Sequence, residues 1–123
     1  MRALVAGLVL LFALPAAASA DAAPWRSAAR VTDGLFHAQT ELVLGGSASA
    51  DVARARRAYT GSFRATLRAA DPAADRAIVA GLRDAARAVR SGDEVALAAA
   101  RGTVRAGLYR GAHAVTLSSD AAT

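Results

Sequence analysis

Three side chains near the start of the chain combine metal-ligating types with helical spacing. Asp33, His37 and Glu41 are four residues apart, so a helix places all three on one face. Carboxylate and imidazole groups are common ligands of transition metals, which makes this trio a candidate metal site. The same face also carries Arg26 and Arg30 and points away from the apolar stripe of the segment. A ladder of both charge signs is typical of a solvated helix face, so we expect no tight metal site here.

No other combination of residues in the sequence indicates catalysis. The chain has no cysteine and one further histidine, His113, which we expect at the surface. It contains no paired-histidine zinc motif, no serine nucleophile elbow and no glycine-rich phosphate loop. Gly107 and Gly111 instead lie four apart within a helical segment, where they predict close helix packing. We therefore expect a protein that is not an enzyme and carries no cofactor of its own.

Arginine supplies all of the positive side-chain charge. The chain has 15 arginines and no lysine against 10 acidic residues, for a net charge of +5. Two strips of arginine fall on the outer faces of expected helices: Arg54, Arg57, Arg64 and Arg68 in one, and Arg83, Arg87 and Arg90 in the other. Such strips solubilise a helix, and they could also contact an acidic protein or an anionic membrane surface. No aromatic residues alternate with them, which argues against a nucleic-acid partner.

Hydrophobic periodicity and helix breakers divide most of the chain into four helical segments. The first two are expected over 24–44 and about 51–70, with no pattern typical of strands. The third is expected to open at Asp71-Pro72, with Asp71 as its cap, and to stop at Ser91-Gly92; the fourth then runs to about Leu117. Ser49 is the expected cap of the second segment, and Ser91 with Glu94 forms an expected capping box before the fourth. Gly61 is expected to weaken or bend the second segment. Short connections between amphipathic helices predict an all-α, up-and-down antiparallel bundle of about four helices.

Two further arginines differ from those in the strips. Arg56 and Arg101 fall near the apolar stripes of their helices. Each therefore either extends out of the core edge or pairs with an acid across the bundle, and the sequence leaves both alternatives open.

The first twenty residues predict export. Met1–Ala20 has a positive charge at its second residue, the apolar run Ala3–Leu14, and small residues at its end. This pattern is typical of a signal peptide cleaved before Asp21, and an uncleaved membrane anchor is the alternative. We expect residues 21–123 to form one helical extracytoplasmic domain on the periplasmic or extracellular side of the envelope. Because it has no cysteine, its stability must come from packing.

Five short stretches of the chain resemble segments of a known protein family. They are A-P-W at 23–25, V-T-D-G-L-F-H-A-Q-T at 31–40, R-A-A-D at 68–71, G-D-E-V-A-L-A-A-A-R-G at 92–102 and G-A-H-A-V-T-L at 111–117. Together with the signal peptide, they resemble the amino-terminal extracytoplasmic region of bacterial high-affinity iron permeases. The resemblance implies a helical outer domain that precedes a multi-helix membrane domain. In that family, glutamates of R-E-x-x-E motifs in the membrane domain bind ferric iron.

The chain departs from this family where the transport chemistry would lie. It has two glutamates, Glu41 and Glu94, and no R-E-x-x-E motif or later apolar segment of membrane-spanning length. No transport residue can be assigned, so the resemblance implies the outer domain, or a fragment, of a permease. It implies a part in iron uptake, with iron as the transported ligand and a membrane permease domain or envelope protein as partner. The alternative is a free-standing secreted module that binds a protein or an anionic envelope surface.

Overall fold

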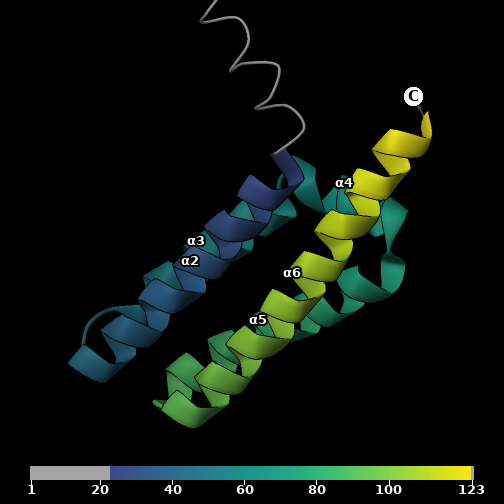
Figure 1. The fold of residues 1–123 in the computed structure, drawn as a ribbon. Helices are drawn as coiled ribbons and strands as arrows, with labels where there is room; N and C mark the ends of the chain where they lie inside the picture. The colour runs from purple at the N-terminus through teal and green to yellow at the C-terminus, as the bar shows by residue number, and fades with distance from the viewer. Residues whose placement is uncertain (1–22, 123) are drawn as a thin grey trace, which may run out of the picture.

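The computed structural model describes residues 23–122, which form helices joined by short turns (Figure 1). The helices are α2 (Ala23–Leu44), α3 (Ala48–Thr60), α4 (Ser62–Ala70), α5 (Pro72–Ser91) and α6 (Glu94–Ala122). These residues include no strand, which confirms the all-α prediction. The predicted signal peptide, Met1–Ala20, lies outside the described residues. No helix within 23–122 combines the length and the apolar character that a bilayer crossing requires.

The helices pack as two pairs connected by α4. Helix α2 lies along α3, α5 lies along α6, and α6 also packs against α2. Helix α4 packs against α5 and α6 near the end of the molecule where α2 begins and α6 ends (Figure 1). Compared with the α2/α3 and α5/α6 pairs, α3 and α5 contact one another only sparsely. The two pairs therefore share a core but leave the space between α3 and α5 incompletely filled.

The start and end of α5 follow directly from local sequence. The backbone N–H of Ala74 donates a 3.0 Å hydrogen bond to Oδ1 of Asp71, the residue before the helix. Pro72 occupies the first turn, where no backbone donor is needed. At the other end Gly92 adopts a left-handed backbone with φ of +67°, which ends the helix. The predicted cap at Asp71 and the predicted stop at Gly92 are both confirmed.

The predicted capping box at the start of α6 is wrong. Asp93 caps this helix, since its Oδ1 accepts a 2.9 Å hydrogen bond from the backbone N–H of Ala96. The hydroxyl of Ser91 donates back to carbonyl oxygens of α5 instead. The cause is the tight turn at Gly92, which keeps Ser91 in the last turn of α5 and leaves Asp93 in the capping position.

The second predicted helix is two helices. Helices α3 and α4 meet at Gly61, whose extended ψ of −148° breaks the run at the residue that the sequence marked as weak. Helix α3 also begins before Ser49, so this serine lies in the first turn and the predicted cap there is wrong. Helix α6 continues past its predicted end at Leu117, because no glycine or proline follows to end it.

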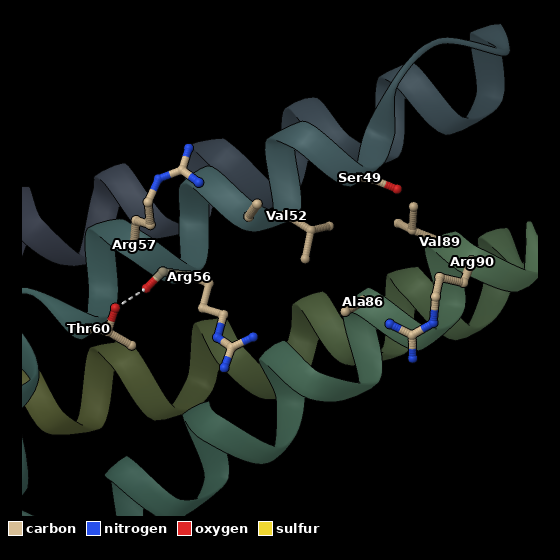
Figure 2. A pocket seen from close by; sticks show the side chains of 9 residues that line it. Ser49, Val52, Arg56, Arg57, Thr60, Ala86, Val89 and Arg90 are labelled. Carbon is tan, nitrogen blue, oxygen red and sulfur yellow. Dashed lines mark hydrogen bonds between the residues drawn. The ribbon is translucent and has the colours of Figure 1, made fainter.

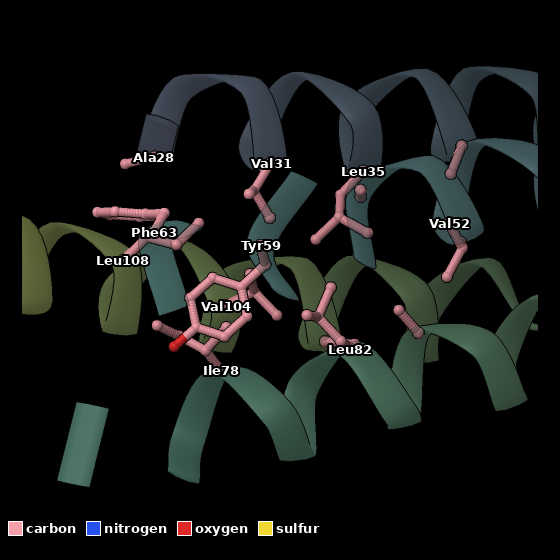
Figure 3. Close-up of a cluster of buried hydrophobic side chains, with 14 of the residues drawn as sticks. Ala28, Val31, Leu35, Val52, Tyr59, Phe63, Ile78, Leu82, Val104 and Leu108 are labelled. Atoms are coloured by element: carbon pink, nitrogen blue, oxygen red, sulfur yellow. The ribbon is translucent and has the colours of Figure 1, made fainter. Parts of the chain in front are cut away.

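The core consists of small and medium-sized side chains at helical spacing (Figure 3). Its largest fully buried members are Tyr59, Leu35, Leu67, Ile78, Leu97, Leu108, Val31 and Val104. Two residues that the stripe of the first helix predicted to be buried are not: Trp25 is 40% exposed and Val43 is 59% exposed. Both lie in a terminal turn of α2, whereas the middle of the helix meets α3 closely at Gly34 and Ala55.

Glycines in α6 allow its neighbours to approach closely, as predicted. A Cβ atom on Gly107 would lie 2.8 Å from Cγ1 of Ile78, and one on Gly111 would lie 2.5 Å from Cδ1 of Leu67. In the facing helix, a Cβ on Gly81 would lie 2.6 Å from Cγ2 of Val104. Side chains from α4, α5 and α6 thus occupy the space that larger residues would need, which confirms the packing role of Gly107 and Gly111.

Candidate functional site

The acidic and histidine side chains of α2 do not form a metal-binding cluster. Asp33 and His37 are exposed, while Glu41 is half-buried with its carboxylate over Gly46 in the following turn. The other histidine, His113, is exposed on α6. Within residues 23–122, no three histidine or acidic side chains are grouped so that they could hold a metal ion. The search for a site therefore moves to cavities and charged surfaces.

A groove of about 540 Å³ lies between α3 and α5, where the two helix pairs diverge (Figure 2). In Figure 2, Val52 of α3 and Val89 of α5 point toward each other across this space. Arg56 and Arg90 extend along its opening, whereas the guanidinium group of Arg57 points away from it (Figure 2). The lining residues are Ser49, Val52, Ala53, Arg56, Arg57, Thr60, Ala86, Val89 and Arg90.

The groove continues toward α4 as a smaller hollow of about 180 Å³. The two parts share four lining residues, Arg56, Thr60, Ala86 and Arg90. The smaller part is lined in addition by Tyr59, Arg64, Val79, Leu82 and Arg83. We refer to the two parts together as the α3/α5 groove. It is a continuous trough with apolar and alanine side chains on its floor and arginines along its sides.

Part of the floor comes from the apolar stripe of α5, whose helical spacing predicts a buried face. Val79, Ala86 and Val89 of α5 belong to its apolar stripe, but each is only half-buried. The apolar stripe of α5 is wider than the surface that α6 and α3 cover, so its edge remains accessible. The sequence identified the right apolar residues and could not tell that part of this stripe lines an open groove.

The charge of the protein is concentrated around this groove. Residues 48–91 contain nine arginines and four aspartates, which equals the net charge of +5 of the whole chain. Within the described residues, Arg56, Arg83 and Arg90 have no carboxylate within 4.0 Å. None of the residues that line either part of the groove is acidic. The groove is therefore electropositive, and three of its arginines have no acid partner within residues 23–122, whereas Arg64 is paired with Asp75.

The structure resolves the two alternatives for the arginines near the apolar stripes. Arg56 is exposed and extends out of the core edge into the groove. Arg101 is half-buried, and its Nη1 donates a 2.9 Å hydrogen bond to Oε1 of Gln39 while its guanidinium lies 5.3 Å from the ring centre of Phe36. Neither side chain pairs with an acid among the described residues.

A buried polar network lies at the α4 end of the groove. The hydroxyl of Tyr59 donates a 2.7 Å hydrogen bond to Oδ1 of Asp75, and Nε of Arg64 donates one of 2.9 Å to the same oxygen. Burial by itself would raise the pKa of Asp75, but the hydrogen bonds from Arg64 and Tyr59 and the charge of Arg64 lower it below its ordinary value. Burial and the bond to this carboxylate raise the pKa of Tyr59. The network therefore holds an ionised Asp75 and ties α3, α4 and α5 together.

Sequence reasoning did not identify Asp75. This aspartate is 4% exposed and shares its helix face with Ile78 and Leu82. An acidic residue on the apolar side of a helix must find a partner when it is buried. The position of Asp75 in the stripe of α5 was thus a signal for a buried pair, although the partners could not be read from it.

The fold and these surfaces define a small all-α domain with a basic, partly apolar groove. The chain matches the family described as Iron permease FTR1 N-terminal domain over residues 20–122. This match covers most of the sequence, so the chain belongs to that family, as its resemblance to the outer region of iron permeases implied. No curated protein and no solved structure matches the chain.

Proposed function

We propose that residues 21–123 form the non-catalytic extracytoplasmic domain of an iron permease system and take part in iron uptake through interaction or delivery. The observation that carries this proposal is the family match over residues 20–122. A role related to iron uptake follows from the family, and the particular role of this chain is our inference. The predicted signal peptide at Met1–Ala20 supports a position outside the membrane.

The arrangement of the helices supports a binding role. We propose that the helices form an up-and-down antiparallel bundle, since turns of only two or three residues join α2 to α3 and α5 to α6. Such a bundle is a rigid scaffold that presents outer helix faces to a partner. A membrane permease domain or an envelope protein is the proposed partner, and iron is the ligand that the whole system transports.

The groove supports a second candidate, a free-standing secreted module that binds a protein or an anionic envelope surface. Its basis is the cluster of arginines around an apolar floor, which would serve binding without any link to iron. The two candidates differ in one respect that can be measured. Only the first requires that iron uptake depend on this domain.

An in-frame deletion tests the leading proposal. Residues 23–122 are removed from the chromosomal gene, the predicted signal peptide is kept, and growth is followed with and without an iron chelator. We expect slower growth only under iron limitation, with recovery when the intact gene is supplied or excess iron is added. Unchanged growth at limiting iron would favour the free-standing module. An alkaline phosphatase fusion after Ala122, active only outside the cytoplasm, tests the proposed location.

A further inference from the structure

We propose that the α3/α5 groove is the docking site for an acidic amphipathic helix of a partner protein. This inference deepens the proposed function, because it states the kind of partner through which the domain would act. It depends on that function only for its biological setting. The physical argument uses the shape, the lining and the charge of the groove.

The length of the groove matches about three turns of a helix. Along α5 the lining runs from Val79 to Arg90, and the eleven helical steps between these residues span about 16 Å, or three turns. Helices α3 and α5 form its two sides, and it opens to the surface along its length (Figure 2). The short side chains of Ala53 and Ala86 lie among the lining residues and allow another backbone to come close. A helix in such a trough is a common mode of peptide recognition.

The floor of the groove provides apolar area for such a helix. Val52 of α3 lines it but is only 4% exposed, so the accessible apolar area comes from Val79, Ala86 and Val89 of α5, each of which is half-buried. Leucine or alanine side chains at helical spacing on the partner would contact these three residues. Burial of this area would stabilise the complex through the hydrophobic effect.

The arginines set the charge of the partner. Arg56 lies on the α3 side, while Arg83 and Arg90 lie on the α5 side. Arg83 and Arg90 are seven residues apart, which is two helical turns and places them on the same face of α5. A partner helix with acidic residues two turns apart would place a carboxylate near each of them. Because no carboxylate of residues 23–122 pairs with these three guanidinium groups, the partner would displace no ion pair within that part of the chain.

The distribution of charge favours a helix over an anionic lipid. A single lipid has one charged headgroup and would need its cationic partners gathered at one mouth of an apolar tunnel. In this groove the arginines lie on both sides and along the length of an open trough. A bare iron cation is a poor occupant as well, since like charge repels it and no acidic residue lines the groove.

A synthetic peptide provides a direct probe. It is an alanine-based helix of about four turns that carries one leucine stripe with glutamates on both sides, labelled for fluorescence anisotropy. A second peptide has glutamine in place of every glutamate. We expect the purified full chain to bind the acidic peptide, and the glutamine peptide to bind at least about tenfold more weakly. We also expect the affinity to fall as salt is added.

Matched variants locate the binding site. The double variant Arg56→Gln with Arg90→Gln removes two charges from the groove and should weaken binding of the acidic peptide about tenfold. The control, Arg30→Gln with Arg76→Gln, removes two exposed arginines that line neither part of the groove, and its affinity should match the parent. Circular dichroism verifies that both variants stay folded. In NMR spectra, the methyl signals of Val52 and Val89 should shift on binding.

Four outcomes would overturn the proposal. The first is that the acidic peptide does not bind, and the second is that the glutamine peptide binds equally well. The third is that the groove and control variants lose the same amount of affinity for the acidic peptide. The fourth is that the chain binds only phosphatidylglycerol vesicles, with the same dependence on Arg56 and Arg90. The last result would identify an anionic membrane surface as the occupant. Because no iron enters this experiment, its failure leaves the role in iron uptake standing. A deletion without effect on iron-limited growth would likewise leave the groove assignment intact.

Discussion

Replacement of Tyr59 by phenylalanine tests the buried network that joins three helices. The substitution keeps the ring, which is fully buried and packs edge-on against Phe63 at 6.2 Å between ring centres. It removes the hydroxyl that donates a 2.7 Å hydrogen bond to Asp75. Hydrogen bonds to charged groups contribute about 1.5–3 kcal/mol, and Asp75 keeps its bond to Arg64. We therefore expect Tyr59→Phe to lower the free energy of unfolding by about 2 kcal/mol at pH 7.

Urea denaturation followed by far-ultraviolet circular dichroism measures this loss. Tyr109→Phe is the matched control, since Tyr109 is 43% exposed and its hydroxyl has no hydrogen-bond partner among the described residues. The control should change stability by less than about 0.5 kcal/mol. Equal effects of the two substitutions would refute the account of the network.

The difference in stability between the parent and Tyr59→Phe should depend on pH. The pKa of Asp75 is lower in the folded chain than its unfolded value of about 3.9. The stabilisation of its ionised form is therefore complete above about pH 4 and is lost as the pH falls through the lower folded pKa. Once the pH is below the folded pKa of Asp75, we expect the difference in stability between the parent and Tyr59→Phe to narrow to about 1 kcal/mol, the size of a neutral hydrogen bond. A gap that widens on acidification would contradict the assignment of an ionised Asp75.

Three further predictions concern packing, a helix end and metal binding. Gly111→Ala should destabilise the chain by about 1–3 kcal/mol in urea denaturation, because its Cβ would overlap Leu67. Gly102→Ala, whose Cβ meets nothing within 4 Å, should stabilise the chain by about 0.5–1 kcal/mol. Effects of the same sign would contradict the packing described for Gly111. Gly92→Ala should cost about 1 kcal/mol in the same assay because of the left-handed backbone there, and an unchanged midpoint would refute this. Calorimetric titration with ferrous and ferric iron should show no micromolar site, and binding abolished by His37→Ala would overturn that expectation.

Much of the fold could be predicted because local chemistry determines it. Asp71 with Pro72 marks the start of α5, and Gly92 marks its end, since each acts through its own backbone geometry. The break at Gly61 was visible as a weak point, but whether a glycine bends or divides a helix depends on what packs around it. The same holds for the turn after α5, where Ser91 stays in the helix and the cap of α6 falls two residues later, at Asp93.

The groove was harder to predict than the helices. Its residues Val79, Ala86 and Val89 carry the same apolar pattern as core residues, because periodicity identifies a face and not its neighbour. How far apart α3 and α5 lie is set by contacts across the whole bundle, including the network at Asp75. The arginine strips, in contrast, were apparent from spacing alone, and the structure adds which of them border an apolar floor.

The most direct test of the central claim, that this domain serves iron uptake, is the initial rate of radioactive iron uptake in cells that lack residues 23–122. Manganese uptake in the same cells is the control for general damage to the envelope. The account predicts a lower iron rate with an unchanged manganese rate, restored when the intact gene is returned. Iron uptake equal to that of the parent strain at limiting iron would contradict it.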